Sequence, residues 1–246
     1  MSPGKNWIAA DWPAPDAVIA GTTLRFGGVS TGAFESLNLG AHVSDDKAAV
    51  DENRHRFAAF CELPSEPRWL RQVHGTTVVV DPAAADCAEA DAAITRKPDV
   101  VCAVLTADCL PVIFSSADGA ELAAAHAGWR GLASGVLEAT IGEMSTAPAD
   151  LLAWLGPAIS QSAFEVGDEV REEFLARDPA AEEHFVSNEH GRWQADLYGL
   201  ARLRLNGLGI GHISGGQYCT FSQPDRFFSY RRDGACGRMA SFVFRK

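Results

Sequence analysis

Residues 100–125 read VVCAVLTADCLPVIFSSADGAELAAA and carry the clearest fold signal in the chain. Residues 100–106, 110–115 and 120–125 are short apolar runs, and polar turns separate them. Runs of this length between turn residues are typical of buried strands. The stretch therefore predicts three successive strands joined by short connections.

Further strands and helices are predicted on both sides of this stretch. Short apolar runs rich in β-branched residues predict strands over residues 17–23, 69–73, 77–80, 151–155, 212–218 and 239–244. Apolar residues that recur on one side predict helices over residues 46–60, 132–144, 166–176 and 196–208. Helices interspersed with many strands indicate an α/β (α+β) architecture built in layers.

Length and composition indicate one globular unit. The chain has 246 residues, of which 47% are hydrophobic and 22% charged, and a chain of this length can bury a core of its own. No Gly/Ser-rich or Pro-rich tract separates two classes of composition. We therefore expect a single domain over residues 1–246.

The net charge of −11 excludes several classes of partner. An acidic protein repels nucleic acid and anionic membranes, so an anionic ligand has to be small and held locally. Residues 1–15 contain no apolar signal-peptide core, and the uncharged run 100–107 is far shorter than the ~18 residues of a membrane span. We expect a cytoplasmic protein with no membrane partner.

The cysteines favour a reducing compartment. They are scattered without a Cys-x-x-Cys pair, so a disulfide framework is not expected in a chain of this size. Their positions are Cys61, Cys87, Cys102, Cys109, Cys219 and Cys236.

Charge is segregated along the chain. Residues 165–183 contain eight carboxylates against Arg171 and Arg177, which is typical of a solvated helix face. Residues 223–246 carry an excess of arginine. Arg231 or Arg232 is a candidate contact for a small anion there, because a guanidinium group matches phosphate or carboxylate oxygens in pairs.

Three motifs combine a predicted strand end, a tight turn and a metal-ligating side chain. They are Gln-Val-His-Gly at 72–75, Thr-Ala-Asp-Cys-Leu-Pro at 106–111 and His-Ala-Gly-Trp-Arg-Gly at 126–131. His74, Cys109 and His126 can converge from such strand ends, and a thiolate with two imidazoles is a preferred ligand set for Zn²⁺. The fourth position would stay open to water or substrate, as in a catalytic site.

Other interpretations of these residues remain open. Cys109 and both histidines are also explained as core residues, or as a thiol nucleophile activated by His126 or His74. Asp108 either orients a ligand, shuttles a proton or shapes a turn. The remaining histidines lack such neighbours and are expected at the surface or in helix caps: His42, His55, His184, His190 and His212.

These motifs and several others resemble those of the YfiH family, also called the laccase-domain, polyphenol oxidase or peptidoglycan editing factor family. The resemblance extends from about residue 18 to the C-terminus and its motifs occur in the expected order. The other motifs are Arg-Phe-Gly-Gly-Val-Ser-Thr-Gly at 25–32, Ser-Leu-Asn-Leu-Gly at 36–40, Leu-Gly-Pro-Ala-Ile at 155–159 and Phe-Ser-Tyr-Arg-Arg-Asp-Gly at 228–234. Cys236 departs from the family, in which Thr is more usual before Gly-Arg.

The resemblance implies a single-domain layered α/β/β/α sandwich with mixed sheets. It implies zinc on His74, Cys109 and His126, and a phosphorylase for adenosine, inosine, guanosine and methylthioadenosine with adenosine deaminase as a second activity. Catalytic roles would fall to these three residues and Asp108. Five further residues of these motifs are candidates for substrate binding. Those for phosphate are Arg25, Arg130 and Arg231, and those for the base or the ribose hydroxyls are Asn38 and Gln72.

The names of the family conflict, and the composition helps to choose between them. A four-copper laccase needs about ten histidines, whereas this chain has seven. A single Cu²⁺ on the same three ligands would instead give a polyphenol oxidase, which is the first alternative. The second is a Cys/His or zinc amidohydrolase that edits UDP-MurNAc-L-Ser, and the third is a metal-buffering protein. We expect a monomer or a weak homodimer whose partners are the purine nucleoside and phosphate.

Overall fold

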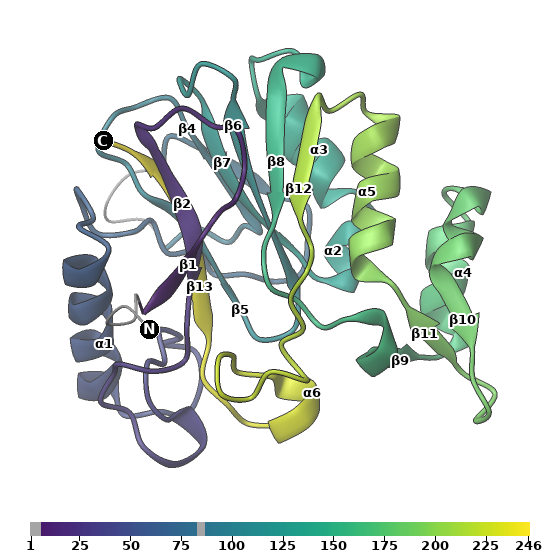
Figure 1. Ribbon diagram of the computed structural model, residues 1–246, viewed down its shortest axis with the longest axis horizontal. Helices are drawn as coiled ribbons and strands as arrows, with labels where there is room; N and C mark the ends of the chain where they lie inside the picture. The colour runs from purple at the N-terminus through teal and green to yellow at the C-terminus, as the bar shows by residue number, and fades with distance from the viewer. Residues whose placement is uncertain (1–5, 83–86) are drawn as a thin grey trace.

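The structure, a computed structural model, describes residues 6–82 and 87–246 and has a mixed α/β architecture (Figure 1). Its largest sheet has six strands in the order β12-β8-β6-β7-β4-β3. The two outer pairs of this sheet are parallel and its inner pairs are antiparallel. Its strands are β3 (Val78–Val80), β4 (Ala92–Thr95), β6 (Leu110–Ser116), β7 (Leu122–Ala127), β8 (Leu151–Leu155) and β12 (His212–Gly215).

Two smaller antiparallel sheets complete the β-structure. A four-stranded sheet has the order β1-β2-β13-β5, and a three-stranded sheet has the order β10-β11-β9. The strands of the first are β1 (Trp7–Ala9), β2 (Val18–Thr23), β5 (Cys102–Thr106) and β13 (Met239–Arg245). Those of the second are β9 (Glu165–Val166), β10 (Phe185–Ser187) and β11 (Trp193–Ala195).

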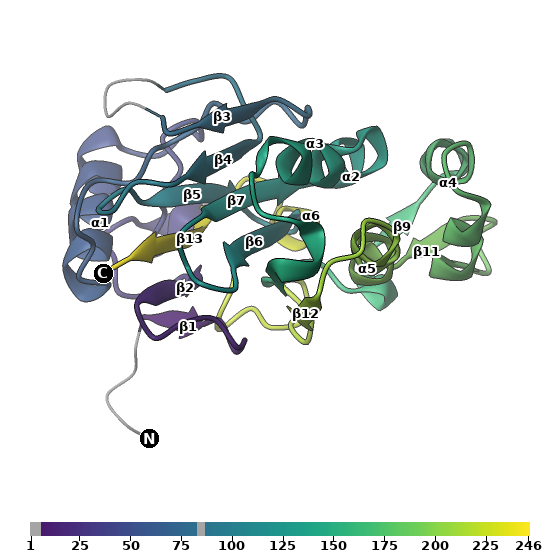
Figure 2. The same cartoon turned by 90° about the horizontal axis from the view of Figure 1, so that it is seen from above.

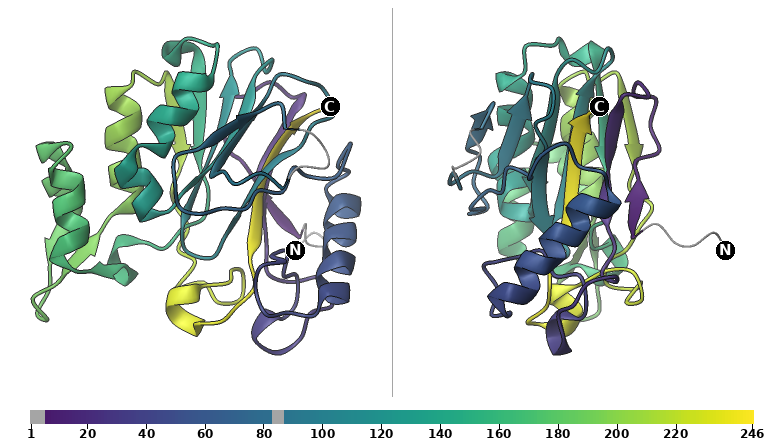
Figure 3. Two further views of the ribbon diagram at one scale, coloured as in Figure 1. Left: turned by 180° about the vertical axis from the view of Figure 1, so that it is seen from behind. Right: turned by 90° about the vertical axis from the view of Figure 1, so that its left-hand side faces the viewer.

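Helices cover the outer faces of the two larger sheets, as the view from above shows (Figure 2). One apolar cluster joins the six-stranded sheet to α2, α3 and α5, and another joins the four-stranded sheet to α1. The view from behind shows α4 with the three-stranded sheet extending away from the rest (Figure 3, left). The helices are α1 (Lys47–Phe60), α2 (Trp129–Ser134), α3 (Val136–Glu143), α4 (Asp168–Leu175), α5 (Leu197–Gly207) and α6 (Tyr230–Asp233), with short 3-10 turns at Gly32–Phe34, Pro148–Asp150, Gln161–Ala163 and Pro179–His184.

The alternation of side chains along the strands explains the layers. In β6, Val112 and Phe114 face the helices, whereas Ile113 packs between the two sheets. In β5, Val104 packs between the sheets and Ala103 faces α1. Because both faces of each strand are buried, the runs are apolar throughout rather than alternating. The layered α/β/β/α sandwich with mixed sheets is therefore confirmed.

Most predicted elements are present, with two corrections. The strand predicted over 69–73 is wrong, because that segment forms only isolated bridges and the side-chain amide of Gln72 pairs with the backbone of Leu105 in place of a strand. The helix predicted over 132–144 is two helices, because Gly135 has φ 100° and separates α2 from α3. The sequence patterns also missed several short strands: β1, β4, β9, β10 and β11.

The acidic residues of 165–183 lie mainly on the exposed side of α4 and the turn after it, as expected of a solvated face. No disulfide joins the cysteines of the described residues. Within 6–82 and 87–246, no helix combines the length and hydropathy that a membrane span requires. The expectation about residues 1–15 lies partly outside the described residues.

Candidate metal centre

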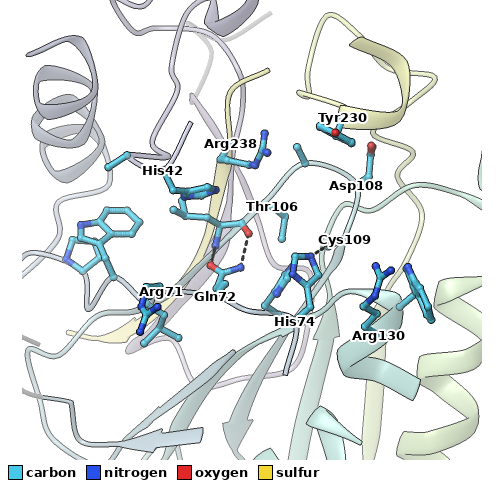
Figure 4. A pocket seen from close by; sticks show the side chains of 18 of the residues that line it. His42, Arg71, Gln72, His74, Thr106, Asp108, Cys109, Arg130, Tyr230 and Arg238 are labelled. Carbon is cyan, nitrogen blue, oxygen red and sulfur yellow. Dashed lines mark hydrogen bonds between the residues drawn. The ribbon is translucent and has the colours of Figure 1, made fainter. Parts of the chain in front are cut away.

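A cavity of about 870 Å³ opens where β5 and β7 end and β6 begins (Figure 4). All three predicted metal ligands line it. Basic side chains surround them from several elements: His42, Arg54, Arg71, Arg130, Arg231 and Arg238. Aromatic side chains supply much of the remaining wall: Trp69, Trp129, Phe164 and Tyr230.

His74, Cys109 and His126 come together although they arrive from three different segments. His126 lies in β7 and is 2% exposed, Cys109 lies in the turn between β5 and β6, and His74 lies in the loop before β3. Their ligand atoms all lie within 4.8 Å of one another. The Sγ of Cys109 is 3.9 Å from the Nε2 of His74, and the two imidazole rings meet edge to face. The convergence expected from the strand ends is thus present.

Asp91, immediately before β4, holds both histidines in place. Its carboxylate is fully buried, and Oδ1 accepts hydrogen bonds from Nδ1 of His126 at 2.8 Å and from the backbone N–H of His74 at 2.9 Å. The other oxygen accepts from the N–H groups of Gly75 and Val73. His74 has φ 61°, a left-handed conformation that these bonds stabilise. Since Nδ1 of His126 is occupied, its Nε2 is the nitrogen left for a metal.

The sequence analysis missed Asp91. Its only signal is an acidic residue placed directly before the short apolar run of β4, a pattern shared by many turn residues.

Glycine allows the close packing around the ligands. A Cβ at Gly128 would lie 3.0 Å from the Sγ of Cys109 and 3.1 Å from the Cδ2 of His74. Any larger residue at this position would displace two of the three ligands. Gly128 also precedes α2, so β7 and α2 can meet directly behind the cavity.

The electrostatics of the group favour a thiolate. Burial acts to raise the pKa of Cys109, but the His126 imidazolium and hydrogen bonds from both histidines outweigh it and lower the pKa to about 6. Burial acts to lower the pKa of His126, but the Cys109 thiolate and Asp91 outweigh it and raise the pKa to about 9. Cys102, buried in β5 without such partners, has its pKa raised by burial to about 12. Cys109 is therefore prepared for metal binding in a way that Cys102 is not.

The donor set fits a tetrahedral metal ion. Metal–nitrogen and metal–sulfur bonds of ~2.0 and ~2.3 Å place donors roughly 3.3 to 3.7 Å apart, so small side-chain rotations bring this group to that spacing. Two imidazoles and a thiolate suit Zn²⁺ or Cu²⁺, and a buried carboxylate behind a histidine is the usual support for such a ligand. Because all three donors line the cavity, a fourth ligand can approach from it.

Asp108 lines the cavity next to Cys109, but its carboxylate is engaged in protein contacts. Oδ1 accepts from the Thr220 hydroxyl at 2.6 Å and Oδ2 accepts from the backbone N–H of Arg231 at 2.7 Å. Its φ is 96°, and its backbone oxygen accepts from Ile159. Of the interpretations left open, this geometry supports the shaping of a turn, which here ties α6 to the Cys109 segment.

Three of the five substrate candidates line the cavity. Gln72 does so, although its side-chain amide donates to the backbone oxygen of Leu105 and accepts from the backbone N–H of Leu105. Arg130 stacks on Trp129 with its Cζ 4.3 Å from the ring centroid. Arg231 donates from Nη1 to the backbone oxygen of Glu165.

Arg25 and Asn38 lie outside the cavity lining. Arg25 donates to the backbone oxygens of Glu35 and Pro224 and so closes the loop before α1. Asn38 is fully buried and bonds within its own loop and to the backbone of Arg238. His42, expected as a surface or cap residue, is solvent-exposed yet lines the cavity. Motif membership alone did not separate residues that shape loops from residues that face the cavity.

Comparison with known proteins agrees with this fold. Residues 19–246 match the family described as multi-copper polyphenol oxidoreductase laccase, and the chain belongs to this family. It is the YfiH family that the motifs indicated. The His-Cys-His group is consistent with a metal-binding family, and nothing in the match identifies the metal.

Curated relatives and solved structures cover nearly the whole chain. The chain is 52% identical to a Pseudomonas aeruginosa protein named purine nucleoside phosphorylase, over 97% of this chain and 98% of that one. It is 51% identical to purine nucleoside phosphorylase YfiH of Escherichia coli, over 96% and 98%. A crystal structure of a Neisseria meningitidis protein superposes with a TM-score of 0.95 at 49% identity, covering 98% of this chain and 100% of that one. YlmD from Geobacillus stearothermophilus gives 0.90 at 30% identity, covering 100% and 98%.

Proposed function

We propose that this protein is a zinc-dependent purine nucleoside phosphorylase that acts on adenosine, inosine, guanosine and methylthioadenosine. The observation that carries the proposal is an open His-Cys-His donor set in the wall of a large cavity that is also rich in arginine. A phosphorylase needs a group that activates the base and cations that bind phosphate, and this cavity offers both. The names of the relatives support the same reaction.

The chain's own residues orient the reactants. Asp91 fixes the tautomer of His126 and the backbone of His74, so the donor nitrogens keep their direction. Asp108 holds the backbone of Arg231, and Arg130 rests on Trp129, so both guanidinium groups are placed to contact phosphate. The aromatic walls offer faces against which a purine can stack and from which water is excluded. Zn²⁺, when bound, would supply a Lewis acid that polarises the base or lowers the pKa of a water molecule.

The same cavity supports adenosine deaminase as a second activity. Deamination at C6 needs an activated water and no phosphate, so it requires only the metal-binding half of the cavity. Phosphorolysis requires the arginines as well.

Two observations favour other functions. The family description names an oxidase, and Cu²⁺ binds such a donor set more tightly than Zn²⁺. In the described residues this is the one cluster of three such ligands, so an oxidase here would run on a single copper. The thiolate form of Cys109 beside an imidazolium also suits nucleophilic attack on an amide, as in a peptidoglycan-editing amidohydrolase.

We expect zinc-loaded protein to convert adenosine and phosphate to adenine and ribose 1-phosphate. Without phosphate it should still yield some inosine and ammonia, because deamination proceeds by attack of water at C6 of the base and needs no phosphate. Chromatography of the products, with zinc content measured on the same sample, checks both results. Cleavage of a muramyl-serine precursor that persists after metal removal but is lost in Cys109→Ala would favour the thiol amidohydrolase instead.

A further inference from the structure

One wall of the cavity carries three basic side chains that the reaction proposed above does not use. They are His42, in the loop before α1, Arg54, on α1, and Arg238, immediately before β13. Figure 4 shows His42 and Arg238 on the same side of Gln72, away from Arg130. His42 and Arg54 come from one loop and the helix that follows it, whereas Arg238 lies far away in the sequence and is brought to them by the fold.

Hydrogen bonds to the backbone and close packing fix the segments that carry these side chains. Leu39 donates its N–H to the backbone oxygen of Arg238 at 3.1 Å, and its own oxygen accepts from Nε and Nη2 of Arg54 at 3.1 and 3.0 Å. The Oδ1 of Asn38 accepts from the N–H groups of both Arg238 and Gly40 at 2.9 Å. A Cβ at Gly40 would lie 2.8 Å from the Cγ of Arg238, so the loop that carries His42 packs directly on the Arg238 stem.

Several donors of the group remain available for a ligand. Arg54 stacks on Trp69 at 4.2 Å and keeps Nη1 without a hydrogen-bond partner among the described residues. Arg238 anchors Nη1 on the backbone oxygens of Cys236 and Gly237, and its Nε and Nη2 have no partner in the same part of the chain. The guanidinium groups are therefore held rigidly while part of each still faces a potential anion.

The charges of the group are not neutralised by neighbouring carboxylates. Within residues 6–82 and 87–246, none of the three forms a salt bridge, whereas Arg71 in the same cavity is paired with Glu89. Glu66 also lines the cavity, and its charge acts to raise the pKa of Arg54, but the two side chains form no salt bridge. The pKa of His42 is lowered, chiefly by desolvation of its ring and then by the nearby charges of Arg238 and Arg54. In a chain of net charge −11, two guanidinium groups without a salt bridge beside an imidazole indicate an anionic ligand.

We infer that His42, Arg54 and Arg238 form a phosphate-binding subsite, separate from Arg130 and Arg231. The guanidinium donors and the imidazole would bind the oxygens of one tetrahedral phosphate group. The phosphate comes either from inorganic phosphate, the co-substrate, or from a phosphate carried by the nucleoside itself. The inference rests on the proposed function only for the identity of the molecule that carries the phosphate group.

The variants Arg238→Gln and His42→Gln test the subsite. In zinc-loaded protein we expect each to weaken phosphate binding about tenfold or more, with unchanged zinc content. His42 makes no hydrogen bond within the described residues, so His42→Gln keeps the test valid if Arg238→Gln disturbs the loop. Arg71→Gln is the matched control, because it removes a charge from the same cavity outside the subsite and should change binding less than twofold.

Isothermal titration calorimetry with inorganic phosphate and with adenosine 5′-monophosphate, together with the KM for phosphate, separates the two sources. If the subsite takes inorganic phosphate, both variants weaken phosphate binding and raise its KM. If it takes the phosphate of the substrate, they weaken binding of the nucleotide alone and leave adenosine unaffected.

Unchanged affinity for both probes in both variants would overturn the inference, as would wild-type protein that binds neither probe. Wild-type protein that binds phosphate through these residues but releases no ribose 1-phosphate would overturn the proposed function and leave the subsite standing.

Discussion

Replacement of Cys109 by alanine is expected to remove the metal and the activity together while leaving the fold intact. One of three protein ligands is lost, but Cys109 lies in a turn at the cavity wall and not in an apolar cluster. Metal content should fall from near-stoichiometric to a small fraction. The rate of phosphorolysis should fall on the order of a hundredfold or more. Metal analysis by mass spectrometry, activity and circular dichroism on one preparation check the three expectations.

Cys102→Ala is the matched control for this prediction. Cys102 is fully buried in β5, and burial raises its pKa to about 12, so it stays a neutral thiol that cannot serve as a ligand. Its replacement should lower the melting temperature slightly and leave the metal in place. Zinc retained near one equivalent by Cys109→Ala would show that the ligand assignment is wrong.

Replacement of Asp91 by asparagine is expected to weaken metal binding about 10- to 100-fold. Asparagine has the same size, but its amide nitrogen cannot accept, so two of the four hydrogen bonds that fix His126, His74 and their loop are lost. The loss of the negative charge also removes one of the groups that raise the pKa of His126. Competition with a chelator gives the affinity, and the visible spectrum of Co²⁺-loaded protein reports the ligand geometry.

Asp81→Asn is the control for a general effect of losing a hydrogen-bonded carboxylate. Asp81 also accepts two hydrogen bonds, from the Thr95 hydroxyl and the N–H of Arg96, but it lies outside the cavity lining. Its replacement should cost stability without changing the Co²⁺ spectrum. Asp91→Asn with wild-type affinity and an unaltered spectrum would mean that the carboxylate does not orient the ligands.

The sequence predicted the parts of the fold in which pattern and burial agree. The strand at 151–155 coincides with β8 because both of its faces are buried and turns bound it. The segment at 69–73 looks similar but is not a strand, because Gln72 supplies the pairing through its side chain. Gly135 divides α2 from α3 through a local conformation that periodicity does not reveal.

The site was predictable where residue chemistry is distinctive and not where its role depends on distant contacts. Cys109 and His126 are ligand types at strand ends, so their convergence followed from the layered architecture. His74 reaches them from a loop, and the strand predicted before it is absent. Asn38 bonds to the backbone of Arg238 across a separation of 200 residues, and no local pattern indicates such a contact. Asp91 likewise differs from an ordinary turn residue only through the four groups that it binds.

The most direct test of a zinc phosphorylase is turnover of adenosine by metal-verified zinc protein in the absence of oxygen. Zn²⁺ has no redox chemistry, and phosphorolysis needs no electron acceptor, so ribose 1-phosphate should form at the same rate with and without O₂. An oxidase requires O₂ and a redox-active metal. No nucleoside product from the zinc form, together with O₂-dependent phenol oxidation by the copper form, would contradict the account.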